Sequence, residues 1–487
     1  MIPEPTDTPE VAEESSYVGR AFEIQGMASR PTQLFRISLA LLGSALGYLT
    51  YTSKVEDQLQ IFLGLLVVIL GFLPGLIWVR HARFELPAFE TFMVTMVPAY
   101  GIPLVSGHDQ LLTYDRDTIT KTAIAVLLFQ AVAITTFLKT TAKPKRTALW
   151  RKNAVSGEIS KYLGYGMFLA IAYTLAENFT NWIPDNLEGP IRAVCFGLGI
   201  IATFVGCRRW GQGELPHYKK TGFALQLAVL VASSLVSLFL VQALSTLLLA
   251  LLGYVSGSKK FPLAATVILL PLFAVLHQGK SAMRDKYWGG NAPLPTIADL
   301  PAFFGEWIND GLLPAPNGGA TLEKHTLLDR TSLIQIICLV VSVTPDKRPY
   351  LYGETYAQVP GQFVPRIFWP EKPVGHISTY TLAIYYGLQR VEDTQRTTIG
   401  FGLLAEAYAN FGFGGICMIG YVFGGLYKKI SGWASESPIL SYPGMILIVL
   451  MAWSFQDELT LSIWLSSLWQ ACAVICVVPF TLNQLSL

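Results

Sequence analysis

Uninterrupted apolar runs close to 20 residues long recur along this chain of 487 residues; clear examples occupy residues 59–79, 122–138 and 461–482. A run of this length crosses the hydrocarbon core of a bilayer as one helix, and helices can pair all their backbone groups there. Only 14% of the residues are charged, against about 25% in a soluble domain. The sequence therefore predicts an all-α polytopic membrane protein.

We expect about twelve transmembrane helices. They lie near residues 34–52, 59–79, 87–106, 119–138, 160–177, 189–207, 221–256, 261–277, 399–427, 439–456 and 459–482. The stretch 221–256 is long for one span, so we expect it to cross twice, with a turn near Gln242–Ser245. Pro98 and Pro103 interrupt the third apolar run, so that span is the weakest of the set.

Basic residues predict the orientation of these helices. Lys and Arg gather at 80–83, 139–152, 208–220, 259–260 and 428–429, and the connections between them are acidic. By the positive-inside rule the basic connections are cytoplasmic. The expected organisation is a disordered cytoplasmic tail (1–33), N-terminal transmembrane helices (34–277), a large exoplasmic loop (278–398) and C-terminal transmembrane helices (399–487), with both termini cytoplasmic.

The large loop has structure of its own in this interpretation. We expect amphipathic stretches near 298–311 and 320–344, followed by a stretch rich in Pro, Tyr and Gly over 345–376. The apolar run 333–343 is too short to cross a bilayer. It is expected to pack against the membrane helices or to enter only partway. A long loop of this kind is usually functional.

Cations in and beside the loop favour an anionic substrate. Lys280 and Arg284 share a helix face if the preceding span continues, although cations above a span also snorkel towards the headgroups. Arg330 follows Asp329, which offers it a simple ion pair. In FVPRIFWPEKP (363–373) the prolines fix the backbone around Arg366 and Lys372. The same stretch could instead be anchored at the interface by Phe368 and Trp369.

A carboxylate follows the loop. Glu406, Tyr408 and Asn410 lie within about one helical turn, among glycines that permit close helix approach. A carboxylate at membrane depth is a functional candidate, and a buried ion pair with Arg396 is the alternative. GxxxxGK[ST] and HExxH motifs are absent from the sequence. We therefore expect no cofactor, no metal site and no nucleic-acid partner.

These motifs, in their order, resemble the bacterial O-antigen and exopolysaccharide polymerases (Wzy-like oligosaccharide repeat unit polymerases). The resemblance covers about residues 278–415. It rests on Lys280 with Arg284, on Arg330-Thr-Ser-Leu, on Tyr352-Gly with Tyr356, on P-R-x-x-W-P-x-K-P (365–373) and on E-x-Y-x-N-F-G (406–412). The first 277 residues match only in being a series of spans.

The resemblance implies a GT-C-like, metal-independent glycosyltransferase of the bacterial cytoplasmic (inner) membrane. It would join undecaprenyl-diphosphate-linked oligosaccharide repeat units at the outer face, with a chain-length regulator and membrane lipid as partners. Its implied residues are Glu406 as general base with His376 as the alternative, Lys280, Arg284, Arg330, Arg366 and Lys372 as diphosphate ligands, and Tyr356 and Tyr408 as sugar contacts.

Three other functions stay open at this point. An O-antigen ligase would share the architecture and the leaving group, and the sequence does not separate it from a polymerase. A transporter or flippase of lipid-linked oligosaccharide fits the number of spans, but the chain shows no evident repeated halves. A structural subunit of an envelope complex is the third alternative.

Overall fold

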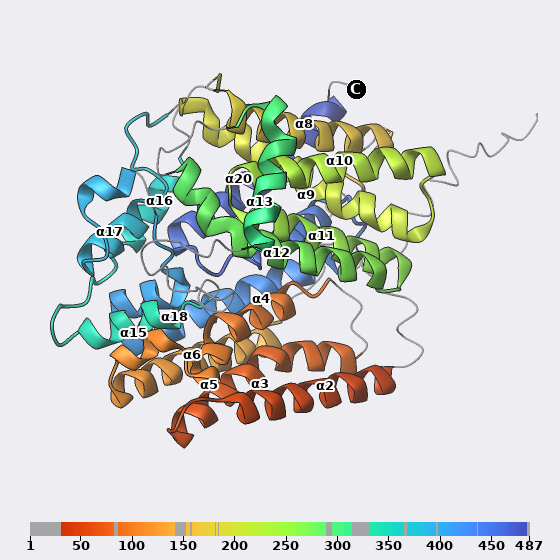
Figure 1. Cartoon of the computed structure of the whole chain (residues 1–487). Coiled ribbons are helices and arrows are strands. Elements are labelled where there is room, and N and C mark those ends of the chain that lie inside the picture. Colours follow the sequence, from red (N-terminus) through yellow and green to blue (C-terminus); the bar gives the residue numbers. More distant parts are fainter. Residues whose placement is uncertain are drawn as a thin grey trace, which may run out of the picture. The chain divides into compact units, whose positions relative to one another are not determined.

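The computed structural model describes residues 31–81, 86–141, 152–155, 158–180, 182–183, 185–288, 295–313, 332–364, 368–395, 398–435 and 437–484. The fold is all-helical, with 79% helix, and the described residues contain no strand (Figure 1). The chain divides into two compact units. Unit 1 comprises residues 1–158 and 331–487, and unit 2 comprises residues 159–330.

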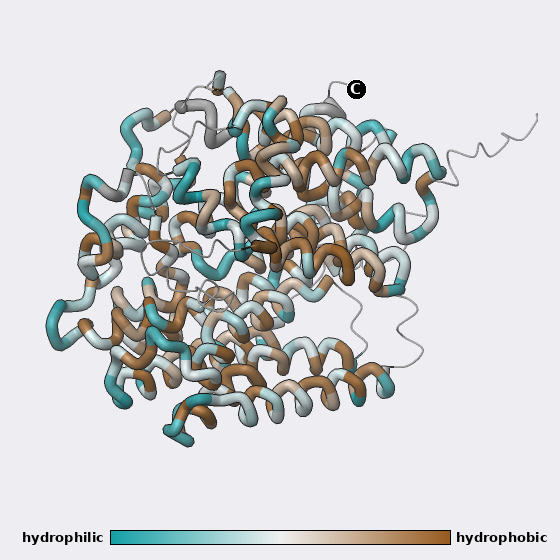
Figure 2. Tube along the Cα trace, in the orientation of Figure 1, coloured by the Kyte–Doolittle hydropathy of each residue, from teal (hydrophilic) through white to brown (hydrophobic). Residues whose placement is uncertain are grey.

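Ten helices within the described ranges are long and apolar enough to cross a bilayer, which is typical of a multi-pass membrane protein. They are α2 (Pro31–Thr52), α3 (Gln58–Arg80), the run α4 (Ala88–Met96)–η2 (Val97–Gly101)–α5 (Ile102–Ser106), α6 (Arg116–Lys139), α9 (Asp185–Gln212), α10 (His217–Val236), α11 (Leu240–Ser258), α12 (Leu263–Tyr287), α18 (Gly402–Ala434) and α20 (Leu461–Gln484). Their apolar character can be followed in Figure 2.

Two of the expected spans are not among these ten helices. α8 (Ile159–Phe179) is long enough but less apolar, and α19 (Tyr442–Trp453) has only 12 residues. A helix of that length is about 18 Å long, well short of a hydrocarbon core of about 30 Å. The total of twelve spans and the GT-C-like arrangement therefore stay predictions, as does the orientation of the termini.

The stretch 221–256 forms two helices, as expected, but the turn between α10 and α11 lies at Ser237–Phe239 rather than at Gln242–Ser245. Leu238 takes a left-handed conformation there, with φ of 58°. The third span also forms in spite of its prolines. Pro98 lies in the first turn of η2, a π-helical turn. Such a turn tolerates the missing proline N–H, which would break a regular α-helix.

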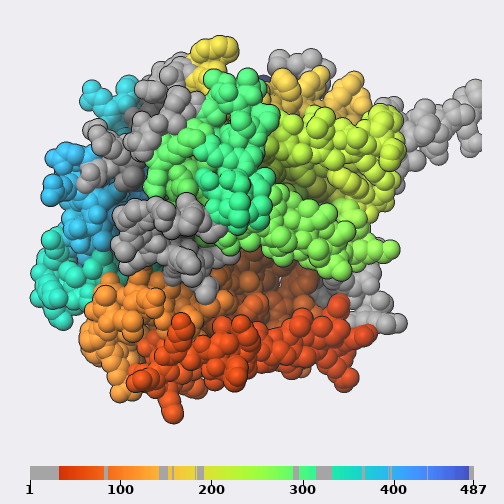
Figure 3. Space-filling view, viewed as in Figure 1, coloured from red at the N-terminus to blue at the C-terminus, as the bar shows by residue number. Residues whose placement is uncertain are grey.

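Unit 1 is built around α18, which packs along α6; α6 in turn packs on α3. α2 packs against α3, and its outer face carries exposed apolar side chains such as Leu41 (Figure 3, red). A cluster of aromatic rings in mutual contact fills the space where α4, α6, α18 and α20 meet. It comprises Phe89, Phe92, Phe129, Phe137, Phe423, Tyr427 and Trp464.

The second half of the expected loop belongs to unit 1. It contains α15 (Ile334–Val343), η5 (Tyr356–Gln358), α16 (Val359–Gln362), α17 (Ile377–Tyr385) and η6 (Val391–Gln395). α15 packs on α18 and α6, and Ile334, Ile337 and Cys338 on it are fully buried. The prediction that the run 333–343 packs against membrane helices is therefore confirmed. α17 was not expected from the sequence.

Unit 2 contains α8 to α12, the short η4 (Ile297–Asp299) and α13 (Leu300–Leu312). α9 packs between α8 and α11, and α13 packs on α12. Trp307 of α13 is fully buried, and its indole N–H donates to Leu276 O at 2.7 Å. The amphipathic stretch expected near 298–311 is therefore helical. The stretch near 320–344 is described only from residue 332.

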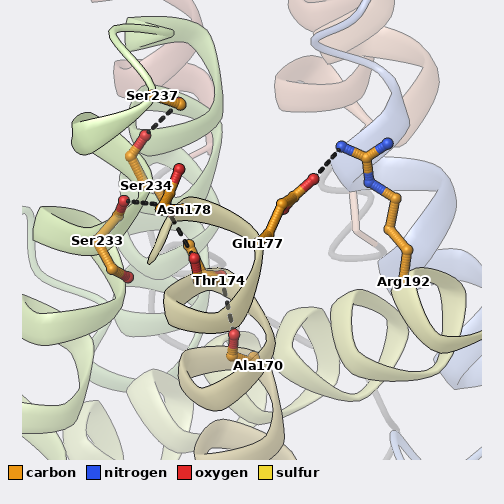
Figure 4. A network of polar contacts seen from close by, with 8 residues as sticks. All are labelled: Ala170, Thr174, Glu177, Asn178, Arg192, Ser233, Ser234 and Ser237. Atoms are coloured by element: carbon orange, nitrogen blue, oxygen red, sulfur yellow. Dashed lines mark hydrogen bonds and ion pairs between the residues drawn. The ribbon is translucent and has the colours of Figure 1, made fainter. Parts of the chain in front are cut away.

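Polar side chains join the helices of unit 2 (Figure 4). Asn178 Nδ2 donates to Thr174 O within α8 and to Ser233 O of α10, each at 2.9 Å. Arg192 of α9 forms an ion pair with Glu177 at 2.8 Å. A polar group in an apolar medium costs free energy unless it finds a partner, and these contacts supply partners between neighbouring helices.

Glycines allow the closest helix contacts in both units. A Cβ on Gly424 of α18 would overlap Ala133 O of α6, and a Cβ on Gly257 of α11 would overlap Arg208 O of α9. Lipid tails supply no hydrophobic driving force between helices, so small residues that bring backbones into contact are the usual basis of association. Each unit therefore depends on at least one glycine-lined helix face.

Gly424→Ala should destabilise unit 1, because the new methyl group has no space against α6. Overpacking of this kind costs about 1–3 kcal/mol. Gly425→Ala is the matched control, because its Cβ would lie 3.9 Å from the nearest atom, Thr136 Cγ2. Alanine favours the helix by up to about 1 kcal/mol, so the control should be neutral or stabilising. The midpoint of thermal unfolding in detergent tests both variants, and equal midpoints would contradict this packing.

Candidate functional site

The site lies at a break in α18. Phe411 (φ −143°, ψ 17°) and Gly412 (φ 57°, ψ −141°) are not helical, so the helix consists of two legs. A Cβ on Gly412 would lie 2.7 Å from the hydroxyl of Tyr350 and its left-handed φ would be strained, so glycine is required there. Non-helical backbone at membrane depth is tolerated where it is buried in protein or lines a cavity. The carbonyl groups freed by the break therefore need donors from elsewhere in the chain.

Residues 350–356, which we call the docking segment, supply these donors. Leu351 N donates to Ala409 O at 3.0 Å, and Tyr352 N donates to Asn410 O at 3.2 Å. Gly353 N donates to the side-chain oxygen of Asn410 at 2.9 Å. The exoplasmic loop expected from the sequence thus contributes its YLYGETY motif directly to the end of the first leg of α18.

Asn410 is the centre of this contact and is fully buried. Its Nδ2 donates to Glu406 O and to Thr355 Oγ1, each at 2.8 Å. Together with the bond accepted from Gly353, this amide uses both of its hydrogens and its oxygen. Ser378 of α17 adds a bond from its hydroxyl to Thr355 O at 3.0 Å. The docking segment is therefore held on two sides.

Glu406 lies one turn before Asn410 and has no exposed surface. Its Oε2 accepts a bond of 2.6 Å from Leu461 N, the first residue of α20. A carboxylate at this position satisfies an amide that a helix start leaves unpaired. Its other oxygen, Oε1, is buried and has no hydrogen-bond partner among the described residues, although Thr355 lies beside the carboxylate. One oxygen of Glu406 is thus held by the start of α20, and the carboxylate also lies beside the Thr355 side chain.

Tyr356 is the second group with an unused polar atom. Its hydroxyl is buried and has no hydrogen-bond partner in the described part of the chain. Burial, and second the nearby charge of Glu406, raises the pKa of this phenol. The hydroxyl of Tyr356 is therefore neutral and can donate, and the charge of Glu406 acts on it. The structure brings these two predicted residues together.

Aromatic rings surround the break. Tyr408, predicted to contact sugars, is only 4% exposed, and its ring packs against Tyr350 and Phe413 at 6.5 and 5.4 Å. Tyr352 is 74% exposed and Phe411 is 40% exposed. The rings that a ligand could reach in this conformation are therefore those of Tyr352 and Phe411 rather than that of Tyr408.

His376 and Lys372 lie in unit 1 outside this cluster. His376 is exposed before the first turn of α17, and its ring stacks on Tyr380 at 6.0 Å. Lys372 Nζ donates to Val364 O at 2.8 Å and to Gln362 O at 3.4 Å. The ammonium group therefore ties the proline-rich stretch back onto α16. Phe368 is 80% exposed, as expected of an interfacial side chain.

Two of the remaining predicted cations are among the described residues, and both belong to unit 2. Lys280 and Arg284 lie in unit 2 on α12, which continues past residue 277 as a regular helix, so the shared face expected for them is present. Lys280 is buried. Arg284 donates to Leu238 O at 3.0 Å and lies over the rings of Trp288 and Phe239, at 4.0 and 5.1 Å. Arg330 and Arg366, like the Arg396 considered as a partner for Glu406, lie outside the described residues.

The turn between α19 and α20 carries two further carboxylates, Asp457 and Glu458. Glu458 O accepts a bond of 2.9 Å from Gly402 N at the start of α18. Burial raises the pKa of its neighbour Asp457 to about 7, and the charge of Glu458 adds to this effect. This turn therefore fixes the start of α18 on one side and, through Leu461, holds Glu406 on the other.

Sequence reasoning missed the part of Thr355, Ser378 and Leu461 in this arrangement. Leu461 acts through its backbone, and Ser378 lies in a helix with no clear sequence signal. Thr355 could have been found from its place in YLYGETY beside the E-x-Y-x-N-F-G motif. Groups of three or more His, Cys, Asp or Glu arranged for a metal ion do not occur among the described residues.

One comparison with known proteins gives a match. The profile of a family described as "Domain of unknown function (DUF8712)" matches residues 234–449, less than half of the chain. The matched region includes the docking segment and all of α18. No curated protein matches the chain. No solved structure matches it either.

Asn410→Ala should release the docking segment, because three buried hydrogen bonds lose their partner. A loss of about 2 kcal/mol of local stability corresponds to amide exchange about 30-fold faster. Hydrogen–deuterium exchange of peptides covering 349–356 measures this directly. Gln130→Ala is the control, because that buried amide of α6 bonds to Val67 O, away from the segment. Unchanged protection in Asn410→Ala would contradict this assignment.

Asp457 should make folding depend on pH. Its pKa is raised from 3.8 to about 7, so between these values the folded protein holds a proton that the unfolded chain has released. The free energy of unfolding should therefore fall as the pH rises from about 4 to about 7, by at most about 1.4 kcal/mol per unit. Asp457→Asn should remove this component. Urea unfolding across that pH range checks it, and an identical slope in the variant would overturn the assignment.

Proposed function

We propose that this chain is a membrane glycosyltransferase that polymerises lipid-diphosphate-linked oligosaccharides. The observation that carries the proposal is Glu406. It is a fully buried carboxylate at a break in α18, with one oxygen without a partner among the described residues, under a segment from the expected exoplasmic loop. An ionisable residue at membrane depth marks a functional site by default. Its place beside the docking segment favours chemistry on the outer face.

The proposed reaction needs a base and a stabilised leaving group. Glu406 Oε1 would take the proton from an acceptor hydroxyl, whose oxygen attacks the anomeric carbon of the donor sugar. The bond from that carbon to the diphosphate breaks, and the carrier leaves as a lipid diphosphate. Positive charge near the departing phosphate would stabilise it. Arg366 is the first cation to test, because Lys372 and Arg284 already donate to backbone carbonyl groups.

Because Glu406 is fully covered, catalysis requires the docking segment to move. Thr355 and Tyr356 lie beside the carboxylate, and they belong to the same seven residues that the Asn410 amide holds in place. Opening a few hydrogen bonds costs little compared with a chemical barrier. We therefore expect substrate binding and opening of this segment to be coupled.

Glu406→Gln should abolish polymer in a deletion strain of the host that is complemented with this gene. The amide keeps the size of the side chain but cannot accept a proton. Arg366→Ala should have the same result, while Glu371→Gln is the control, because Glu371 is an exposed carboxylate in the same loop. Gel electrophoresis of the surface polysaccharide gives the chain lengths, and immunoblotting of membranes verifies expression.

The deletion strain itself separates the alternatives. A polymerase defect leaves single repeats, whereas long chains still attached to their lipid carrier would indicate an O-antigen ligase. Normal chain length in Glu406→Gln would contradict the role of this residue. An unchanged polysaccharide profile in the deletion strain would overturn the proposed function.

A transporter of lipid-linked oligosaccharide is the second candidate, and the break in α18 favours it. Interrupted membrane helices with buried polar residues form the substrate and ion sites of many transporters. In that case Glu406→Gln should block translocation of the lipid-linked glycan, and unpolymerised repeats should accumulate on the cytoplasmic side. Lectin labelling of inverted vesicles, which expose the cytoplasmic face of the membrane, distinguishes this outcome from a polymerase defect.

A further inference from the structure

Tyr352 has a backbone conformation that its side chain does not favour. Its φ is 45°, in the left-handed region, where Gly and Asn occur at little cost and a bulky residue is an outlier. Its ring is 74% exposed and contacts the ring of Tyr350 at 6.1 Å, edge to face. The fold therefore uses the backbone of Tyr352, which bonds to Asn410 O, while the ring contributes little packing. Strain without packing at such a position points to function.

Two neighbouring rings extend this surface, and we call Tyr350, Tyr352 and Phe411 the aromatic rim. Phe411 stands at the break in α18 and is 40% exposed. Gly353 separates it from Tyr352, and a Cβ on Gly353 would lie 3.2 Å from the Phe411 ring. Because Gly353 has no side chain, the Phe411 ring packs directly on the backbone of the docking segment, next to Tyr352 in the sequence. The rim lies on the docking segment and on α18, the two parts that meet above Glu406.

Unsatisfied polar atoms lie within reach of the rim. Thr355, beside the Glu406 carboxylate, follows Tyr352 by three residues, a separation of at most about 11 Å. Glu406 Oε1 and the Tyr356 hydroxyl are both buried without hydrogen-bond partners in the described part of the chain. They offer one acceptor and one donor. A ligand that covers the rim thus meets flat apolar rings and, deeper, two polar atoms.

This combination fits a sugar ring better than a lipid chain. A pyranose has an apolar C–H face that can lie on an aromatic ring and hydroxyl groups at its edge that both donate and accept. An acyl chain would cover the rings but has no group that could pair with the carboxylate oxygen or the phenol.

We infer that the aromatic rim is the subsite for the acceptor sugar, a pyranose whose hydroxyl group is directed towards Glu406. The inference rests on the proposed function. It assigns the stacking role to Tyr352 and Phe411, in place of the largely buried Tyr408. Tyr352 is the residue that contacts the sugar, and Gly353 is the residue that keeps the surface open.

Photocrosslinking in cells tests the class of ligand. p-Benzoylphenylalanine in place of Tyr352 should, after irradiation, give an adduct that carries saccharide and stains after periodate oxidation. The same amino acid in place of Phe368, the exposed ring of the proline-rich stretch, is the control and should capture phospholipid. Phospholipid adducts alone at position 352, or no adduct there, would overturn the inference.

A variant series tests the residue. The protein in nanodiscs is titrated with a panel of methyl hexopyranosides, and saturation-transfer NMR gives the dissociation constants. Tyr352→Gly should weaken binding of the best ligand about tenfold, whereas Tyr352→Phe should retain it, because stacking needs the ring. Tyr352→Gly should not lower the midpoint of thermal unfolding, because glycine adopts the left-handed conformation freely. Equal binding by wild type and Tyr352→Gly, or no binding of any glycoside, would overturn the subsite.

The two proposals can fail separately. If the deletion strain shows a normal polysaccharide profile while Tyr352 still binds glycosides, the proposed function fails and the subsite stands. If polymer depends on Glu406 but Tyr352→Gly binds and polymerises normally, the subsite fails alone.

Discussion

The break in α18 is the constraint on which the arrangement of unit 1 depends. A helix interrupted inside a bilayer exposes backbone carbonyl groups that neither lipid nor water pairs. Here the docking segment supplies the missing N–H donors at Ala409 and Asn410, and the Asn410 side chain completes the junction. The segment can do so only because Gly412 leaves space for Tyr350. The position of the docking segment, the burial of Glu406 and the exposure of Tyr352 all follow from this junction.

The described cations that were predicted to bind diphosphate do not form a simple positively charged surface. Lys372 donates to carbonyl groups of its own proline-rich stretch, and Arg284 is held between two aromatic rings and a backbone carbonyl. Each bond to a charged group is worth about 1.5–3 kcal/mol, so these cations also stabilise local structure. An anion would have to compete with those contacts. This makes the carboxylate and its aromatic surroundings the better-defined part of the site.

Local patterns predicted the helices well. The long apolar runs form helices, glycines lie at close helix contacts, and the short run 333–343 forms the packed helix α15. These features could be predicted because each depends on a local sequence pattern. The division of 221–256 was predicted, but its position was not, since the turn depends on the tertiary contact of Leu238 with Arg284. Glu406 and Tyr356 were both selected from motif order, and in the structure the charge of Glu406 acts on the Tyr356 phenol. The hydrogen-bond partner of Glu406 was not predicted, because it is the backbone N–H of Leu461, and a backbone group has no sequence signal.

Exposure was the property that sequence reasoning judged least well. Tyr408 and Tyr352 are both tyrosines within the quoted motifs, yet Tyr408 is buried and Tyr352 is exposed. What separates them is the left-handed backbone at Tyr352 and the packing of Tyr408 against Phe413. The left-handed backbone arises where Tyr352 meets Asn410, 58 positions away, and the ring contact arises where the break in α18 folds Phe413 back towards Tyr408.

The bond between Glu406 and Leu461 also has a consequence for biosynthesis. The docking segment leaves the ribosome before α18, and α18 leaves before the start of α20 that pairs with its carboxylate. From Glu406 to Leu461 there are 55 positions, which take on the order of 3–11 s to translate. Throughout that interval the growing chain has the carboxylate and the docking segment without the amide that pairs with the carboxylate. The candidate site is therefore completed only when the start of α20 has been made.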